Sequence, residues 1–398
     1  MHGIKYFPKN LNIKDKTIIL RVDFNVPIES KEIKDSTRIL SVIPFLEELI
    51  KKESKIIIIS HLGRPKGKKK NELSLLPIFK ILKEKIKIPI YFYTGEIDRE
   101  AKKKCSYLKS GEIMLLENIR FFEEESMNDE NFSKRLAELG DIYINNAFSC
   151  SHRKEASIHN ITKFMKECFA GPLIEKELSA INLLIKDKKE PVTCIVGGSK
   201  ISTKINILSN LIKNTDNIIV VGAMANNFIY YKGLEIGKSM VERDSKEIIK
   251  KIYLEAKKYR CNIIIPEDFL VSKNYDGEAS SKNIDMVKKD EIILDIGPKT
   301  IQAINNKIDD SNTVMWNGPA GYFENKNFAI GTNSIAKKIS KNTSEKSLIS
   351  ILGGGDTISA INNSKLSLSF THLSTAGGAF LESLEGKELP GIKVLKKN

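Results

Sequence analysis

Short aliphatic runs alternate with amphipathic stretches of helical period along the whole chain, and this alternation restricts the fold more than any other feature of the sequence. Strands buried on both faces need continuous apolar runs, and the intervening helices cover the sheet. The alternation therefore predicts β-α-β units in an α/β fold with parallel sheets. Strands are expected at 17–22, 55–60, 112–116 and 141–145, and then at 192–196, 217–221, 262–265, 291–295, 313–316 and 348–352.

The length of 398 residues points to two domains, because a single hydrophobic core usually stops growing at a smaller size. Between the two groups of strands, 172–186 carries apolar residues at helical spacing and is expected to form one rigid connecting helix. We therefore expect two doubly wound, Rossmann-like parallel-sheet domains, over 1–171 and 187–376, joined by a hinge helix over 172–186.

The chain carries 64 Lys and Arg against 50 Asp and Glu, a net charge of +14 that would suit an anionic partner. Many lysines stand beside glutamates on helical faces, and no basic stretch carries interleaved aromatic residues, so nucleic-acid binding is not expected. No apolar run is long enough to cross a bilayer, and we expect no signal peptide, because no apolar segment follows the lysine of MHGIKYFPKN. The 5 cysteines occur singly, which predicts free thiols in a reducing cytoplasm and no zinc site.

Cationic and amide side chains follow the expected strands of the first half. Ligands of open parallel sheets bind beyond the carboxyl ends of the strands, and guanidinium groups pair well with phosphate and carboxylate. Any one arginine alone is more simply explained as a surface ion pair, but several at equivalent strand ends predict a site for a small phosphorylated acid. The residues concerned are Arg21, Asp23, Asn25, His61, Arg64, Arg120, His152 and Arg153, with Arg38 just before the first long helix.

Glycines follow the expected strands of the second half, in VGGSK, VVGAMA, DIGP, WNGP and LGGGDT. Glycines before a helix expose backbone N–H groups to a phosphate, and the helix N-terminus adds partial positive charge. Neither GxxxxGK[ST] nor GxGxxG occurs in these turns, which argues against a P-loop and against a standard dinucleotide site. We expect Lys200 and Lys204 on one face at a helix start, and Asp356 near a phosphate-bound magnesium ion.

Several motifs taken together resemble the phosphoglycerate kinase family. They are RVDFNVP, SHLGRP, LLENIRF, GGSK with a second lysine four residues later, WNGPAGYFE, GGGDT and STAGGAFLE, and they run in family order from about residue 4 to residue 391. The resemblance implies a phosphotransferase that reversibly moves the acyl phosphate of 1,3-bisphosphoglycerate to Mg-ADP, giving 3-phosphoglycerate and ATP in glycolysis. It also implies a monomer whose C-terminal segment, 377–398, packs back on the N-terminal domain.

The resemblance assigns roles residue by residue. On the 3-phosphoglycerate side it implies Asp23, Asn25, Arg38, His61, Arg64, Arg120 and Arg153. On the nucleotide side it implies Lys200, Lys204, Gly222, Asn317, Glu324, Gly353, Gly354, Gly355, Asp356 and Thr357, with Glu324 on the ribose hydroxyls and Asp356 on Mg²⁺. The catalytic residues would be Arg38, Lys200, Gly354 and Gly377.

Some residues depart from the family pattern. Where the family commonly reads Asn-Asp-Ala-Phe-Gly, this chain has Asn146 and Ser149 in place of the aspartate and the glycine. Ala223 and Ala376 replace glycines in turns near the adenine, and each adds a methyl group. We expect somewhat weaker nucleotide binding without loss of activity, because the residues expected to bind the phosphates and magnesium are all present.

The expected reaction needs no general base, because its acceptor in the ATP-consuming direction is a carboxylate that is already ionised at neutral pH. What remains is to align the reacting oxygens and to stabilise charge on the transferred phosphoryl group. Two ligands on two domains would require the domains to close and exclude water.

Two other classes of protein, a dehydrogenase and a nucleic-acid- or membrane-binding protein, share some of these features. A nicotinamide-dependent dehydrogenase would share the doubly wound sheets but would need the dinucleotide fingerprint, which is absent from these turns. A basic protein that binds nucleic acid or a membrane surface would show salt-sensitive retention on DNA without coupled ATP formation.

Overall fold

The computed structural model describes residues 3–29 and 32–396, so 1–2 and 397–398, at the ends of the expected N-terminal domain and C-terminal segment, lie outside it. The chain divides into two compact units, Met1–Leu178 with Glu388–Asn398 and Ser179–Lys387. The division between Leu178 and Ser179 falls inside α6 (Pro172–Ile185), at the place expected for the connecting helix.

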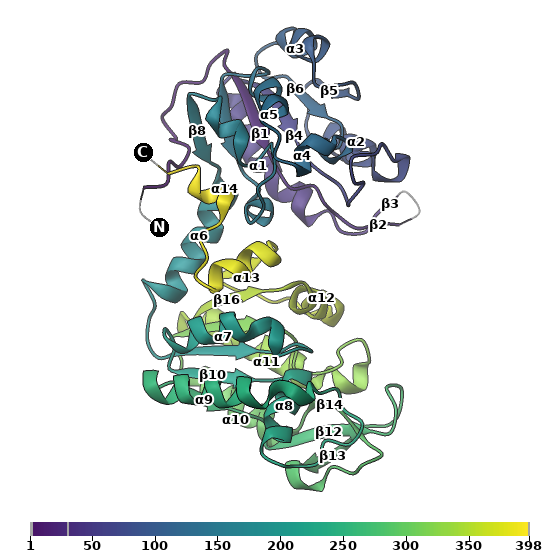
Figure 1. Cartoon of the computed structure of the whole chain (residues 1–398), viewed down its shortest axis with the longest axis vertical. Coiled ribbons are helices and arrows are strands. Elements are labelled where there is room, and N and C mark those ends of the chain that lie inside the picture. Colours follow the sequence, from purple (N-terminus) through teal and green to yellow (C-terminus); the bar gives the residue numbers. More distant parts are fainter. Residues whose placement is uncertain (1–2, 30–31, 397–398) are drawn as a thin grey trace. The chain divides into compact units, whose positions relative to one another are not determined.

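A six-stranded parallel sheet forms the centre of the first unit, in the order β5-β6-β4-β1-β7-β8. Its strands are β1 (Thr17–Arg21), β4 (Lys55–Ile59), β5 (Ile90–Tyr93), β6 (Ile113–Leu116), β7 (Ile142–Asn145) and β8 (Glu167–Ala170) (Figure 1). The helices of this unit are α1 (Thr37–Lys51), α2 (Leu76–Lys85), α3 (Arg99–Ser106), α4 (Glu123–Ser126), α5 (Glu130–Ala137) and α14 (Pro390–Lys393), with a short hairpin of β2 (Ile28–Glu29) and β3 (Glu32–Ile33).

The core of the first unit explains the aliphatic runs. Ile18 to Leu20 in β1 and Ile56 to Ile59 in β4 are fully buried, because both strands lie in the middle of the sheet. Ile39 and Val42 of α1 belong to the same hydrophobic cluster as β1, so one face of α1 covers the sheet.

The C-terminal segment up to Lys396 lies beside the N-terminal segment that begins at Gly3 (Figure 1), and Ile4 forms an antiparallel bridge with Lys396. Lys5 N–H donates to the Leu395 carbonyl at 2.9 Å, and Gly391 N–H donates to the Ser151 carbonyl at 2.8 Å. The segment 388–396 therefore belongs to the first unit, whereas α13 (Gly378–Leu384) belongs to the second.

The second unit contains another six-stranded parallel sheet, in the order β11-β10-β9-β15-β16-β17. Its strands are β9 (Val192–Val196), β10 (Asn217–Val220), β11 (Asn262–Ile264), β15 (Thr313–Asn317), β16 (Ile349–Gly353) and β17 (His372–Ser374). The helices are α7 (Ile205–Ile212), α8 (Ala223–Tyr231), α9 (Lys246–Tyr259), α10 (Pro298–Asp309), α11 (Ile330–Lys346), α12 (Gly355–Ser364) and α13. The fold class expected from the sequence is confirmed.

A small antiparallel sheet in the second unit was not expected. It consists of β12 (Asp268–Ser272), β13 (Ser280–Asn283) and β14 (Ile292–Ile296), in the order β13-β12-β14. The aliphatic run at 291–295 is therefore a strand, but it does not join the parallel sheet. A short apolar run has the same appearance in either sheet, because periodicity does not report strand direction.

No helix among the residues that the structure describes is long and apolar enough to cross a membrane. All the cysteines are free, as the sequence predicts.

Candidate functional site

A carboxylate after the end of β1 pairs with the first turn of α1. Arg38 is the second residue of α1, so it lies inside the helix rather than just before it, as was expected. Its Nη1 donates to Asp23 Oδ2 at 2.7 Å and to the Asn25 carbonyl at 3.0 Å. The Ser149 hydroxyl donates to the same oxygen of Asp23. Burial opposes ionisation of Asp23, but His61, Arg38 and the Ser149 hydroxyl together lower its pKa below the ordinary value. Asp23 is therefore ionised at neutral pH and holds Arg38.

A buried arginine fixes the histidine beside this pair. Arg21, the last residue of β1, is fully buried and its Nη2 lies 3.2 Å from Nδ1 of His61. Because a guanidinium only donates, this contact assigns the proton of the neutral ring to Nε2. Burial lowers the pKa of His61 well below its ordinary value. The negative charge of Asp23 raises this pKa, whereas the nearby guanidiniums lower it further. At neutral pH His61 is thus an uncharged donor, not a cation.

Arginine side chains converge on Glu155, two residues after Arg153. Arg120 Nη2 donates to Glu155 Oε1 at 2.7 Å, and Arg120 Nη1 donates to the Gly63 carbonyl at 3.0 Å. Arg153 Nη1 lies 3.7 Å from the same Oε1, and Arg21 Nη2 lies 3.9 Å from Oε2. The Glu155 side chain is only 6% exposed. No motif in the sequence indicated a role for Glu155.

The residues expected on the substrate side therefore gather at one edge of the first unit. Asn25 Oδ1 accepts the Gly63 N–H at 2.8 Å, and Gly63 in turn accepts from Arg120, which links the Asp23 group to the Glu155 group. Arg64 is exposed and follows Gly63 directly. The residues joined by these contacts are Asp23, Asn25, Arg38, His61, Arg120 and Arg153.

Donor atoms of Asp23, His61 and Cys150 lie within 4.8 Å of one another, a spacing compatible with a metal ion. The surroundings oppose a cation, because Arg21 and Arg38 contact members of this group. Burial, with Asp23 adding to it, raises the pKa of the Cys150 thiol to about 11, so the thiol keeps its proton. We assign no metal to this group.

The Asn146 side chain contacts the start of α6 rather than the arginine cluster. Its Oδ1 accepts the Leu173 N–H at 2.8 Å, in the first turn of that helix. An aspartate at this position would add negative charge at a helix N-terminus, so the amide keeps the hydrogen bond and loses the charge.

Side chains tie together the ends of the central strands of the second unit. Lys204 Nζ donates to the Gly197 carbonyl at 2.6 Å and to Asn317 Oδ1 at 2.7 Å, and Asn317 Nδ2 donates to the Gly353 carbonyl at 2.6 Å. Burial lowers the pKa of Lys204 to about 8, although the charge of Asp356 opposes the shift. Lys204 is therefore cationic at neutral pH, but it loses its proton at a pH only slightly above neutral.

Glycine turns bring the backbones of these strand ends together. A Cβ on Gly318 would lie 2.5 Å from the carbonyl carbon of Gly197, and a Cβ on Gly354, where φ is +104°, would lie 2.5 Å from Asn317 Nδ2. Thr357 Oγ1 accepts the Gly318 N–H at 2.7 Å and fixes the turn before α12. The first N–H groups of α12 can therefore face a phosphate.

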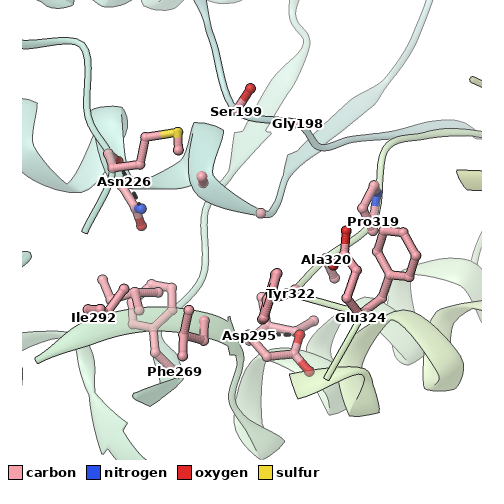
Figure 2. A pocket seen from close by; sticks show the side chains of 18 of the residues that line it. Gly198, Ser199, Asn226, Phe269, Ile292, Asp295, Pro319, Ala320, Tyr322 and Glu324 are labelled. Carbon is pink, nitrogen blue, oxygen red and sulfur yellow. Dashed lines mark hydrogen bonds between the residues drawn. The ribbon is translucent and has the colours of Figure 1, made fainter. Parts of the chain in front are cut away.

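A pocket of about 260 Å³ opens beside these turns. Figure 2 shows Phe269 and Ile292 together on one side, and Ala320, Tyr322 and Glu324 on another. Its mostly apolar lining with a few polar groups is typical of a site for a small organic ligand. Among the residues expected at a nucleotide, Gly222, Glu324 and Asp356 line it, and so does Ala223, whose methyl group was expected there.

The remaining nucleotide-side residues occupy different surroundings. Lys200 is exposed and lies before the 3₁₀ turn η5 (Ser202–Lys204), with α7 starting only at Ile205. The expectation that Lys200 and Lys204 share one helix face is therefore wrong, because the glycine turn continues past Lys200. Gly377 precedes α13 with φ of +55°, and open space surrounds the place of a Cβ. Ala376 beside it is buried.

Comparison with known proteins gives a consistent result. The family model described as Phosphoglycerate kinase matches residues 9–387. The chain belongs to the phosphoglycerate kinase family. The phosphoglycerate kinase of Chelativorans sp. (strain BNC1) is 41% identical, with all of both chains covered, and that of Wolbachia pipientis wMel is 43% identical, with 98% of each covered.

Solved structures of phosphoglycerate kinases resemble the whole chain. The structure of the enzyme from Coxiella burnetii superposes with a TM-score of 0.89 at 36% identity, covering 97% of both chains. The crystal structure from Pyrococcus horikoshii OT3 gives 0.81 at 28% identity, covering 98% of both. The resemblance inferred from the motifs is confirmed.

Sequence reasoning missed most of the pocket wall. Phe269 and Leu294 come from the antiparallel sheet, and Tyr322 comes from the WNGPAGYFE motif, in which Asn317, the following glycine and Glu324 were singled out but the tyrosine was not. Asp295 precedes Gly297 in DIGP, where the glycine alone was considered. A carboxylate at a strand end was the available signal for Asp295, whereas nothing in the sequence indicated where β12 would lie.

Proposed function

We propose that this chain catalyses the reversible transfer of the acyl phosphate of 1,3-bisphosphoglycerate to ADP, which gives 3-phosphoglycerate and ATP in glycolysis. The observation that carries the proposal is the arginine cluster around Asp23 and Glu155 in a chain of this family. Guanidiniums on ordered hydrogen-bonded supports suit a small acid that bears both phosphate and carboxylate.

The acid substrate would bind to the first unit. Asp23, through its contact with Arg38, and the Gly63 backbone, through its contact with Arg120, orient guanidiniums before the substrate arrives. His61 would contribute an uncharged Nε2–H donor. The residues proposed to bind the acid are Asp23, Asn25, Arg38, His61, Arg64, Arg120 and Arg153.

The nucleotide would bind to the second unit, with its base in the pocket beside Tyr322 and Glu324 at the ribose hydroxyls. Lys204 and the turn before α12 would hold the phosphates. The proposed set is Lys200, Lys204, Gly222, Asn317, Glu324, Gly353, Gly354, Gly355, Asp356 and Thr357.

Magnesium fits this donor set. Asp356 is an exposed carboxylate in the first turn of α12 and lines the pocket, and Mg²⁺ is commonly held by one or two carboxylates together with substrate phosphates. When bound there, the ion would neutralise charge on the nucleotide phosphates.

Transfer itself would depend on alignment and charge stabilisation. We assign contact with the transferred phosphoryl group to Arg38 and Lys200, with backbone N–H groups at Gly354 and Gly377. No general base is required, because the acceptor is a carboxylate. We further propose that the chain works as a monomer in the cytoplasm, and that its two domains close about the 172–186 helix. The expected bounds, 1–171 with 377–398 and 187–376, need one change, because 377–387 belongs to the second unit and only the part from Glu388 onward returns to the first.

The direct test is ATP formation from 1,3-bisphosphoglycerate and ADP, measured with Mg²⁺ and with excess chelator. We expect magnesium-dependent ATP formation at a kcat of roughly 1–1000 s⁻¹, the ordinary range for enzymes. Absence of ATP formation by folded protein, together with salt-sensitive retention on DNA, would favour a binding protein instead.

A further inference from the structure

Glu155 is a negative charge inside a cluster that the proposed function assigns to an anionic substrate. The mechanism above gives it no task. Its Oε1 accepts a hydrogen bond from Arg120 at 2.7 Å and lies 3.7 Å from Arg153 Nη1. Its Oε2 has no hydrogen-bond partner among the described residues and lies 3.9 Å from Nη2 of buried Arg21.

The geometry around Arg120 shows what the carboxylate contributes. Arg120 is held from two sides, by the Gly63 carbonyl through Nη1 and by Glu155 through Nη2, and its side chain is only 10% exposed. The backbone of Gly63 is itself held in place, because the Gly63 N–H donates a hydrogen bond to Oδ1 of Asn25. Removing either support would leave a long, flexible side chain free to adopt several rotamers, and binding would then have to order it.

Arg153 is held by Glu155 less closely than Arg120 is. Its side chain is 38% exposed, its contact with Glu155 is an ion pair at 3.7 Å, and its Nε donates a hydrogen bond to Nε2 of the neighbouring His152 at 3.2 Å. The Glu155 carboxylate is therefore the group that couples the direction of Arg153 to that of Arg120. One oxygen serves both guanidiniums, so their separation is set by a single side chain.

We propose that Glu155 is a positioning residue: it holds Arg120 and Arg153 so that their remaining N–H groups meet the anionic groups of the acid substrate. This inference rests on the proposed function and deepens it. A carboxylate here also repels an anionic ligand, so the two effects predict opposite signs. Positioning makes removal of the charge weaken substrate binding, whereas repulsion alone makes removal strengthen it.

The test is Glu155→Gln, assayed in the direction that consumes 3-phosphoglycerate and ATP. A neutral amide of the same size loses the charged hydrogen bond to Arg120, so we expect KM for 3-phosphoglycerate to rise about tenfold. We expect kcat and KM for ATP to change by less than about threefold, since the nucleotide residues lie in the other unit. An unchanged or lower KM for 3-phosphoglycerate in folded variant would overturn the proposal.

Glu291→Gln is the matched control. Glu291 pairs with Lys282 at 2.5 Å and is 9% exposed, so it is a comparably buried ion pair, in the second unit. We expect it to lower the melting temperature while leaving KM for 3-phosphoglycerate unchanged. If KM for 3-phosphoglycerate rose equally in both variants, the effect of Glu155→Gln would come from general destabilisation of the protein. That result would contradict the proposal.

A double-mutant cycle with Arg120→Lys separates positioning from independent contributions. If Glu155 acts through Arg120, the two substitutions together raise KM for 3-phosphoglycerate by clearly less than the product of their separate effects. Strictly multiplicative effects would contradict the proposal. Glu155→Asp, which keeps the charge on a shorter side chain, replaces Glu155→Gln if that variant does not fold, and the same rise is expected.

If wild-type protein makes no ATP, the proposed function fails, and calorimetric titration with 3-phosphoglycerate still tests the inference. Weaker binding by Glu155→Gln than by wild type would support positioning, and equal or tighter binding would overturn it.

Discussion

Burial sets the charge of the titratable side chains at these sites as much as their neighbours do. Asp23 stays ionised because a guanidinium and a hydroxyl contact its carboxylate, whereas burial keeps His61 neutral. A sequence motif shows that a histidine or an aspartate is present but gives neither its burial nor its contacts. The charge of each residue could therefore not be predicted from the sequence.

Lys204 predicts a pH dependence for nucleotide use. Its pKa is lowered to about 8 by burial, so the ammonium is present below that pH and lost above it. We expect kcat/KM for ADP to fall as pH rises through about 8, because a neutral amine attracts phosphate weakly. In Lys204→Arg the guanidinium stays charged, and the fall over this range should disappear. Identical profiles for wild type and this variant would contradict the assignment.

Asp356 predicts a magnesium dependence. Replacement by Asn keeps the shape and removes the anionic ligand, so more magnesium should be needed for half-maximal binding of ADP. Calorimetric titration of ADP at several magnesium concentrations measures this requirement. An unchanged requirement would remove Asp356 from the proposed metal site.

The strands that the sequence predicted are mostly the inner ones, and those that it missed are edge strands, strands of the three-stranded antiparallel sheet, or the short pair β2 and β3. β1 and β4 are buried on both faces and carry unbroken aliphatic runs. β8 and β17 close their sheets at one side and read ECFA and HLS, without such a run. Edge strands need fewer apolar residues, so periodicity gave no signal for these two. The glycine turns were predictable because each is local, whereas the pocket wall joins segments that are distant in sequence.

Asp295 joins two elements and predicts a stability change with pH. It is buried at the end of β14, and it accepts the Gly331 N–H at 2.8 Å in the first turn of α11. Burial raises the pKa of Asp295 to about 7, although hydrogen bonds from the backbone N–H groups of Gly331, Ile296 and Ile330 lower it. The folded chain therefore binds this proton more tightly than the unfolded chain, and the contribution of Asp295 to stability falls as pH rises from about 4 to about 7.

Asp295→Asn removes this titration. Relative to the variant, wild type should gain stability on acidification from pH 7.5 to pH 5, by on the order of 2 kcal/mol. Guanidinium unfolding at several pH values measures the difference. A difference that stays constant with pH, or changes in the opposite direction, would show that Asp295 is not protonated in the folded state.

At the scale of the whole molecule, the two parallel sheets carry different kinds of residue at their strand ends. Each brings strand ends together, one carrying guanidiniums and the other carrying glycine turns and a pocket. The motifs predicted both sets, because residues that follow successive parallel strands must meet at one edge. They did not predict Glu155, which stands outside the recognised motifs and owes its place to the loop after β7.

The formation of an acyl phosphate tests the central claim most directly. Protein incubated with 3-phosphoglycerate, ATP, Mg²⁺ and hydroxylamine should release a hydroxamate, because hydroxylamine traps the acyl phosphate, and the product should require every substrate. Arg38→Ala should fold normally but form hydroxamate at least about a hundredfold more slowly, as expected for loss of a charge contact in transfer. Wild-type protein that binds both substrates yet forms no hydroxamate, or an Arg38→Ala variant that forms it at the wild-type rate, would contradict the account.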